Sequence, residues 1–339
     1  MLERELDKDG RPTFKYKSTL RELSERLLSN TCLIFLGAGA SIDSRTPDRD
    51  LPTGEELSRY LAEECKLEWH DYIPLSTIAF YFEFFFSRDR LDRILREKIG
   101  NPDIKPSPTV ERLIDIIALL EESGRRSFVI TTNYDQHFEH AYRKKLNREP
   151  GIIIYKGGWD PKDDKEELHT GIDQYGSKFW LPSESTKTYL YKMHGCITQP
   201  ENHGLVITEE DYINFLTNTM SQNDQKKSLL TYALGQITLR TILFVGYSLA
   251  DWNFRVIYKA AVESSGGKRN SSYAIQFRRK GTPEKPETAL ERTRWESLSS
   301  FWMRKNIEII NSDAALFMSD LLDTTRELMG NKTMTVGKG

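Results

Sequence analysis

Short apolar runs alternate with longer amphipathic segments along most of the chain. The runs are continuous and rich in Ile, Leu, Val and Phe, which is typical of strands buried on both faces of a parallel sheet. They cover residues 31–36, 127–132, 152–155, 188–192, 241–245, 272–277 and 307–310. Helical periodicity covers residues 18–29, 55–100, 109–122, a stretch that ends near 145, 223–237, 251–264, 288–304 and 314–329. This alternation predicts an α/β protein with a doubly wound, mostly parallel sheet and helices on both faces.

Two predicted insertions interrupt this alternation within one domain that spans residues 1–329. Residues 55–107 are expected to form a helical insertion subdomain, and residues 156–187, rich in Gly, Asp, Lys and Ser, an irregular insertion. Residues 330–339 are expected to be a flexible tail. The length of 339 residues also fits two domains, because a domain holds about 150 residues.

The charge of the chain is nearly balanced, with 48 Lys and Arg against 50 Asp and Glu, and the formal net charge is −2. Nucleic acid is therefore not expected as a partner of this chain alone, although a local basic patch stays compatible with this charge. Every apolar run is far shorter than the ~18 residues of a membrane span, so no membrane association is expected. The amino terminus is charged and lacks the apolar core of a signal peptide, which predicts a cytoplasmic protein.

Glycine or polar residues directly follow four of the predicted strands. In chain order these segments are Gly37–Ser41, Asn133–Asp135, His194 and Gly246–Asp251. Ligands of open α/β sheets bind beyond the carboxyl ends of the strands, so these residues are expected to converge on one crevice.

The first of these segments, Gly-Ala-Gly-Ala-Ser, has the composition of a phosphate-binding turn. Gly37 and Gly39 permit a tight turn and a close approach of the backbone to a phosphate, and a helix amino terminus behind them favours an anion. The turn lacks the third glycine of a dinucleotide fingerprint, because Ile42 occupies that position, and it lacks the Gly-Lys-Ser/Thr of a P-loop. Taken alone, the glycines are equally compatible with a purely structural turn.

Four motifs occur together in a fixed order: Gly-Ala-Gly-Ala-Ser, Thr-Thr-Asn-Tyr-Asp, Lys-Met-His-Gly and Val-Gly-Tyr-Ser-Leu-x-Asp. This combination resembles the sirtuin-like family, specifically the bacterial branch found in anti-phage defence systems. The resemblance covers about residues 20–328 and is weakest in the segments 57–107 and 156–187. It implies a Rossmann-like sheet that binds NAD.

The resemblance also implies a role for each motif. The NAD pyrophosphate would be held by Gly37, Ala38, Gly39 and Ser41. The nicotinamide-ribose pocket would be lined by Thr132, Asn133 and Asp135, with Asn133 near the ribose hydroxyls and the attacking water. His194 would be the general base. The adenosine side would be contacted by Gly246, Tyr247, Ser248, Asp251 and, after the strand 307–310, Asp313.

The chain departs from the protein-deacylating members of this family. Its cysteines, Cys32, Cys65 and Cys196, are widely spaced, so the four-cysteine zinc module of those enzymes is absent and no metal is expected. Thr46-Pro47-Asp48-Arg49 only faintly matches their Gly-Ile-Pro-Asp-Phe-Arg loop. Members that resemble this chain hydrolyse NAD, so the resemblance implies an NAD hydrolase that yields nicotinamide and ADP-ribose.

The expected role is that of an effector which depletes NAD during phage infection. One alternative is a catalytically silent module that binds NAD or a nucleotide and assembles with a HerA-like helicase or ATPase. Another alternative is a protein deacylase. A nuclease is disfavoured, because the sequence shows no cluster of acidic residues that could bind the metal ions needed to cleave nucleic acid. A toxic hydrolase must be held inactive, so family analogy predicts control by assembly or by a separate partner protein.

The residue types in these motifs fit hydrolysis of the nicotinamide–ribose bond. Nicotinamide leaves readily because its ring nitrogen is already cationic, and the transition state resembles an oxocarbenium ion. The enzyme then needs to position the substrate and to supply a base for water. A histidine with an ordinary pKa of about 6.5 serves as that base at neutral pH, and an asparagine orients water without adding charge.

Each of these residues also has a purely structural interpretation. His194 can be a core histidine satisfied by hydrogen bonds. Asn133 and Asp135 can cap the helix that follows them, and the same holds for Ser248 and Asp251. Capping and substrate binding are compatible at one position.

The helical insertion contains six aromatic residues in the seven from Phe80 to Phe86. It begins with a predicted capping box in which Thr53 is the N-cap and Glu56 its partner. Aromatic residues on every side of a helix need cover on every side, from a helical subdomain or from a second subunit. A homo-oligomer is therefore expected.

His137 and His140 have a spacing that occurs in metal sites, but no His-Glu-x-x-His motif accompanies them. Cys196 lies beside the His-Gly pair and is interpreted as a small buried hydrophobe rather than a nucleophile.

Overall fold

The computed structural model describes residues 2–3, 13–42, 51–70, 73–100, 104–155, 186–198, 204–220, 239–249, 254–256, 258–259, 270–278 and 287–336. The predicted helix 223–237, the candidate site residue Asp251 and all but two residues of the predicted insertion 156–187 lie outside this part of the chain. Within the predicted helix 251–264, the described residues are helical.

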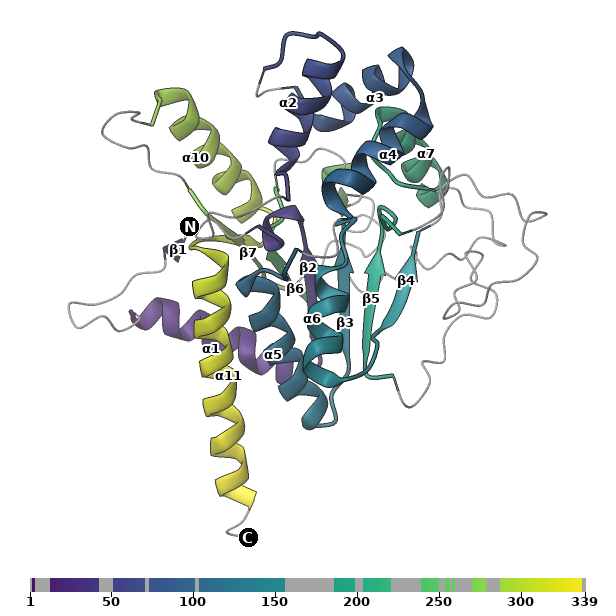
Figure 1. The fold of residues 1–339 in the computed structure, drawn as a ribbon. Helices are drawn as coiled ribbons and strands as arrows, with labels where there is room; N and C mark the ends of the chain where they lie inside the picture. Colours follow the sequence, from purple (N-terminus) through teal and green to yellow (C-terminus); the bar gives the residue numbers. More distant parts are fainter. Residues whose placement is uncertain are drawn as a thin grey trace. The chain divides into compact units, whose positions relative to one another are not determined.

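Within the described residues, eight strands form a sheet in the order β1-β8-β7-β6-β2-β3-β5-β4 (Figure 1). The strands are β1 (Leu2–Glu3), β2 (Cys32–Leu36), β3 (Ser127–Thr131), β4 (Gly151–Ile154), β5 (Thr188–Lys192), β6 (Thr241–Val245), β7 (Ser272–Gln276) and β8 (Ile307–Asn311). The pairs β1–β8, β8–β7, β7–β6, β6–β2 and β5–β4 run parallel. The predicted α/β class with a parallel, Rossmann-like sheet is confirmed.

The chain divides into two compact units, each of which is described by itself. Unit 1 comprises residues 1–41, 108–129 and 235–339, and unit 2 comprises residues 42–107 and 130–234. The helices are α1 (Phe14–Leu28), α2 (Gly54–Glu64), α3 (Leu75–Phe85), α4 (Arg88–Ile99), α5 (Pro108–Glu122), α6 (His137–Leu146), α7 (Glu209–Met220), α10 (Ala289–Met303) and α11 (Ala314–Val336). The short turn η1 (Ala38–Ala40) is a 3-10 helix.

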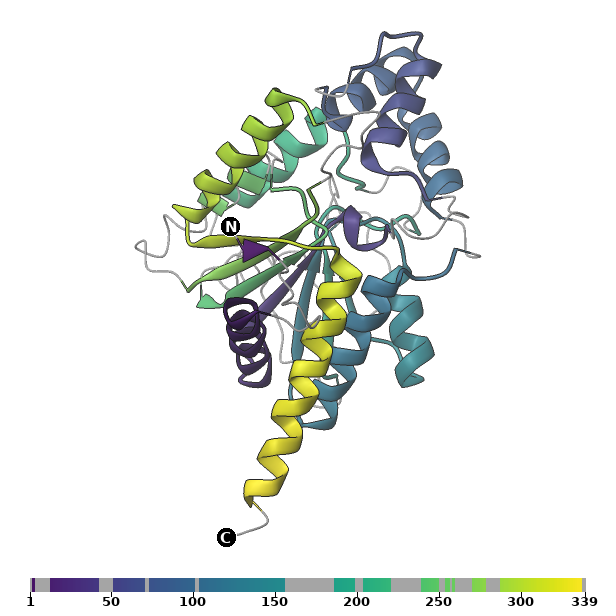
Figure 2. The ribbon, with the colours of Figure 1, turned by 90° about the vertical axis from the view of Figure 1, so that its left-hand side faces the viewer.

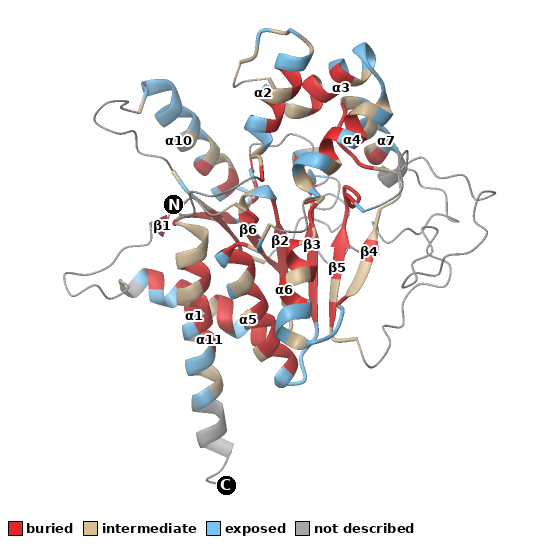
Figure 3. Ribbon diagram, viewed as in Figure 1, coloured by how far each residue is buried: buried red, intermediate tan, exposed pale blue. Residues whose placement is uncertain are grey.

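In unit 1, helices cover both faces of the sheet. Figure 2 shows α1, α5 and α11 on one face and α10 on the other. Every residue of β2 and β6 is buried (Figure 3). This two-sided cover explains why these strands are continuous apolar runs rather than alternating patterns.

The register of β2 and β6 determines where their loops begin. Cys32 pairs with Thr241, and Leu36 pairs with Val245 at the other end. The two strands therefore end at the same level, and the loops that follow them start side by side.

In unit 2, α2, α3 and α4 pack around an apolar core that includes Leu61 and Phe82. The predicted capping box at the start of α2 is confirmed, since Thr53 Oγ1 accepts the Glu56 N–H at 3.0 Å and Glu56 Oε2 accepts the Thr53 N–H at 2.7 Å. The helical pattern expected over 55–100 consists of three separate helices rather than one.

Three elements differ from the sequence-based expectations. Helix α7 was not predicted, although a reciprocal cap marks its start. The Thr208 N–H donates to Asp211 Oδ2 at 2.9 Å, and the Asp211 N–H donates to Thr208 Oγ1 at 3.2 Å. Strand β1 was not predicted either, and it pairs with β8. Helix α11 continues to Val336, beyond the predicted end at residue 329. Among the described residues, no helix combines the length and apolar character that crossing a lipid bilayer requires.

Candidate functional site

In unit 1, the glycine turn after β2 is hydrogen-bonded to the loop after β6. The Gly37 N–H donates to Val245 O at 3.0 Å, and the Gly39 N–H donates to Gly246 O at 2.8 Å. Both amides, which the sequence assigned to phosphate contacts, therefore donate within the protein. Gly37 is the N-cap of the single 3-10 turn η1 (Ala38–Ala40), which contains Gly39, whereas the sequence predicted the amino terminus of a helix behind the two glycines.

The glycines of these two loops are explained by the close approach of the loops to each other. A Cβ on Gly37 would lie 2.4 Å from Tyr247 Cα, and a Cβ on Gly246 would lie 2.0 Å from Ala40 N. Gly246 also has a φ of +63°, which favours glycine. The packing of the two loops therefore requires glycine at positions 37 and 246 whether or not a ligand binds.

The other predicted contacts of unit 1 lie in different environments. The Tyr247 ring is buried and packs edge-on against Phe35, with ring centroids 4.8 Å apart. Ser41 is buried, whereas Ala38 and Ser248 are exposed. Asp313 caps α11, because its Oδ1 accepts the Leu316 N–H at 3.0 Å. Their contacts with NAD stay predictions from the resemblance.

In unit 2, the loops that follow β3 and β5 are held together by backbone hydrogen bonds. The Met193 N–H donates to Thr131 O, and the Ile197 N–H donates to Tyr134 O, both at 2.9 Å. The segment with Thr132, Asn133 and Asp135 therefore lies beside the segment with His194, as the sequence predicted for strand ends at one edge of a sheet.

Asn133 and Asp135 are both buried in this pair of loops. The Asn133 N–H donates to Thr131 Oγ1 at 3.0 Å, which stabilises the turn after β3. Asp135 Oδ1 accepts the His137 N–H at 2.9 Å, so the carboxylate caps the start of α6. The capping interpretation thus applies to Asp135, and it leaves a catalytic or binding role open.

His194 is buried against two aromatic rings of α7. Its ring centroid lies 5.2 Å from that of Tyr212 and 5.6 Å from that of Phe215. Burial lowers the pKa of His194 to about 3. The imidazole is therefore neutral at pH 7, and the assumption of an ordinary pKa for this base is wrong.

Lys192, the last residue of β5, connects the two loops to α6, and sequence reasoning gave it no role. Its Nζ donates to the backbone oxygen of Asp135 and, at 2.8 Å, to Glu139 Oε1. Burial alone would lower the pKa of Lys192, but Glu139 and other nearby acidic groups raise it above its ordinary value. Lys192 therefore carries its charge in the core. The signal in the sequence was a lysine at the end of an apolar strand, directly before the Met-His-Gly motif.

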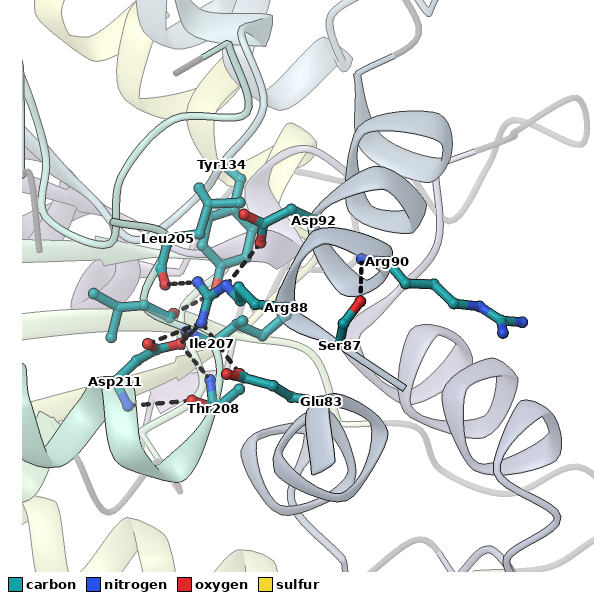
Figure 4. A network of polar contacts seen from close by, with 11 residues as sticks. Glu83, Ser87, Arg88, Arg90, Asp92, Tyr134, Leu205, Ile207, Thr208 and Asp211 are labelled. Atoms are coloured by element: carbon teal, nitrogen blue, oxygen red, sulfur yellow. Dashed lines mark hydrogen bonds and ion pairs between the residues drawn. The ribbon is translucent and has the colours of Figure 1, made fainter. Parts of the chain in front are cut away.

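A second missed residue, Arg88, holds α7 in place (Figure 4). Its guanidinium contacts Asp211 at 2.8 Å and Asp92 at 2.9 Å, and it donates to Leu205 O at 2.6 Å. Burial alone would lower the pKa of Arg88, but these carboxylates raise it. Because Asp211 directly precedes Tyr212, this cluster fixes one of the rings that surround His194.

Among the described residues, no group of three or more His, Cys, Asp or Glu side chains is arranged so that it could hold a metal ion. His137 is buried and His140 is half-buried on α6. Cys196 is buried, and its Sγ lies 3.2 Å from Thr198 Oγ1.

The fold and the polar strand ends define an α/β protein of the Rossmann-like class. A sequence profile of the SIR2-like domain matches residues 127–310, which is more than half of the chain. The chain therefore belongs to the SIR2-like family, whose members are NAD-dependent enzymes that use NAD as a substrate. The matched range contains Asn133, His194 and Gly246, but it begins after the glycine turn at 37–41.

Solved structures with remote similarity to the chain include the following two. One, described as the structural basis for the mechanism and regulation of Sir2 enzymes, is 15% identical with a TM-score of 0.43, over 92% of this chain and 98% of that chain. The other, Sir2Af2 bound to a myristoylated histone peptide, is 12% identical with a TM-score of 0.39, over 93% of this chain and 99% of that chain. No curated protein sequence matches the chain.

Proposed function

We propose that the protein is an NAD glycohydrolase that cleaves NAD to nicotinamide and ADP-ribose. The proposal rests on the paired loops of unit 2, which are joined by backbone hydrogen bonds and carry the buried residues Asn133, Asp135 and His194. Buried and precisely held polar groups are what a reaction through an oxocarbenium-like transition state requires, because their dipoles need no reorganisation.

In the proposed reaction, the bond between ribose C1′ and the nicotinamide nitrogen breaks, and its electron pair neutralises the cationic ring. Water then forms the new bond to C1′ and loses a proton. The Asn133 amide orients this water or a ribose hydroxyl, and neutral His194 accepts the proton. Water that has added to an oxocarbenium ion is a strong acid, so a base with a pKa of about 3 is sufficient.

The decisive experiment is incubation of the full chain with NAD, followed by chromatography of the products. Nicotinamide and ADP-ribose in equal amounts are expected. Bound but uncleaved NAD would instead support the catalytically silent module, and nicotinamide released only with an acylated peptide would support a deacylase. Cyclic ADP-ribose would show that a nucleophile of the substrate itself, such as adenine N1, replaces water at ribose C1′.

The silent module is favoured by two observations. The amides of Gly37 and Gly39 donate within the protein, and His194 is shielded by Tyr212 and Phe215. Activity that appears only on addition of a partner would reconcile these observations with hydrolysis.

The proposed biological role is depletion of NAD in an anti-phage defence system, with control by assembly or by a separate protein such as a HerA-like ATPase. A homo-oligomer is supported by α3, which leaves Phe84 76% exposed and Phe85 54% exposed. Large aromatic surfaces of this kind mark interaction sites in soluble proteins. The exposed aromatic residues of α3 therefore support a subunit interface. Phe82 is not among them, because it is buried in the core of unit 2.

A further inference from the structure

Helix α10 of unit 1 borders an open groove that has no part in the proposed hydrolysis. The groove has a volume of about 720 Å³, within the range of about 300–1,000 Å³ that is usual for ligand sites. Its lining includes Arg255, Arg294 and Arg304 together with Trp295 and Phe301. Guanidinium groups and aromatic rings thus line the same groove.

The groove carries an excess of positive charge. Among the described residues that line the groove, only Glu291 is acidic, and its Oε2 accepts the Thr288 N–H at 2.8 Å at the start of α10. Among the described residues, no carboxylate forms an ion pair with the three groove arginines, whereas Arg278 of the same unit pairs with Glu287 at 2.7 Å. The groove arginines are exposed and available to an anion.

The aromatic rings of the groove are partly exposed, in contrast to the neighbouring core tryptophan. Trp302 is buried, and its Nε1 donates to Leu249 O at 3.0 Å. Trp295 and Phe301 are only half-buried. The Arg255 guanidinium lies 5.3 Å from the centroid of the Phe301 ring, so cation and ring are already paired at the groove.

The arginines are spread along the groove. Arg294 and Arg304 are ten residues apart along α10 and its end, which corresponds to about 15 Å on a helix with a rise of 1.5 Å per residue. One phosphate group cannot bridge this distance. An extended polyanion with several phosphates can.

We propose that this groove binds single-stranded nucleic acid without sequence specificity. Phosphates contact the guanidinium groups, and an unpaired base stacks on Trp295, which is the combination that sequence-independent single-strand binders use. A duplex offers no free base faces to the ring, and an acidic peptide offers carboxylates but no planar groups to stack. The near-neutral net charge of the chain does not oppose this site, because the basic charge is local.

The test measures binding of the full chain to a labelled oligothymidine of about 20 nucleotides by fluorescence anisotropy, at ~50 and ~200 mM salt. The double variant Arg294→Glu/Arg304→Glu is expected to weaken binding at least about tenfold. It should also make the negative slope of log affinity against log salt less steep by about 1.4, because two phosphate contacts are lost. Trp295→Leu is expected to weaken binding about tenfold while leaving the salt slope unchanged.

The matched control is Arg21→Glu/Arg326→Glu, which makes the same charge change on exposed helix faces of unit 1 and should preserve affinity within about twofold. The proposal is overturned if the wild-type chain does not bind the strand at micromolar concentration, or if the control weakens binding as much as the groove variant. It is also overturned if Trp295→Leu binds normally, or if a polyglutamate peptide or AMP binds as tightly as the strand.

Discussion

The Nζ of Lys192 lies 2.8 Å from Oε1 of Glu139, and the two side chains are only 1% and 2% exposed. Among the described residues, the second carboxylate oxygen of Glu139 has no hydrogen-bond partner. The same ammonium group donates to the backbone oxygen of Asp135. One buried ion pair therefore connects α6 to the loop that carries the proposed active-site residues.

Breaking this pair should destabilise unit 2 and lower NAD turnover. Lys192→Met leaves the Glu139 carboxylate buried without its counter-charge, which should cost about 3–5 kcal/mol in the free energy of unfolding. The double variant Lys192→Met/Glu139→Leu should recover most of this loss, because an apolar pair of similar volume replaces the ion pair. Its turnover should stay low, since the hydrogen bond from Lys192 Nζ to Asp135 O is lost. Urea denaturation and nicotinamide release measure the two effects, and full turnover in the double variant would show that Lys192 acts on stability alone.

Removal of the proposed catalytic groups should abolish hydrolysis in a folded protein. Asn133→Ala and His194→Gln are each expected to lower the rate of nicotinamide release by about 10²–10⁴-fold, because a positioned group or a base is lost. Cys196→Ala is the control and should keep its activity. Circular dichroism checks the fold. Near wild-type turnover in both site variants would show that the assigned site is wrong.

The buried His194 should make stability depend on pH. Its pKa is lowered by burial from 6.5 to about 3, so the unfolded chain binds more protons than the folded chain between these values. The contribution of His194 to the free energy of unfolding is fully present above pH 6.5 and is lost as the pH falls towards 3. Between these values the free energy of unfolding changes by up to ~1.4 kcal/mol per pH unit. Urea denaturation from pH 7 to pH 4 should show a flatter dependence for His194→Gln than for the wild type. Equal slopes in the wild type and in His194→Gln would contradict the burial effect.

The contact between the two glycine loops should make Gly246 intolerant of a side chain. Gly246→Ala places a Cβ 2.0 Å from Ala40 N at a φ of +63° and should lower the free energy of unfolding by about 3 kcal/mol or more. Gly124→Ala is a matched control, since Gly124 has a φ of +76° but no neighbour within 4 Å of the added Cβ. That control should cost only about 1 kcal/mol. Equal losses in the two variants would mean that backbone strain, rather than the loop contact, requires glycine at Gly246.

The exposed aromatic face of α3 should support self-association. Phe84→Ser/Phe85→Ser is expected to lower the mass measured by light scattering at micromolar concentration, because it removes the two most exposed rings of the helix. Phe277→Ser removes a ring of unit 1 that is 62% exposed and should leave the mass unchanged. A wild-type chain that is monomeric across this range would contradict the proposed oligomer.

The strands could be predicted from sequence because two-sided burial leaves an unmistakable run of apolar residues. The bounds of β5 and β6 agree with the predicted ranges 188–192 and 241–245. Helix α7 was missed because its start, Glu209-Glu210-Asp211, is strongly polar and its apolar positions are few. Its Thr208–Asp211 cap was the available signal.

The site was harder to predict where the chemistry depends on partners distant in the chain. The order of the strand-end motifs indicated that Asn133 and His194 lie in neighbouring loops. Nothing local to Lys192 identifies Glu139 as its partner 53 residues away, and nothing local to His194 reveals the rings that lower its pKa. The glycines of the first turn were assigned to a phosphate, because contact with Gly246 is visible only once β2 and β6 are paired.

The pairing of β2 with β6 also affects how the chain can fold during synthesis. The two strands are roughly 200 residues apart, so at about 5–20 residues per second the ribosome needs roughly 10–40 seconds to deliver β6 after β2 has emerged. During this interval the apolar edge of β2 lacks its parallel neighbour, and pairing over such a separation is intrinsically slow. Nascent chains of this protein should therefore depend on chaperones that shield exposed strands until residues 241–245 are made.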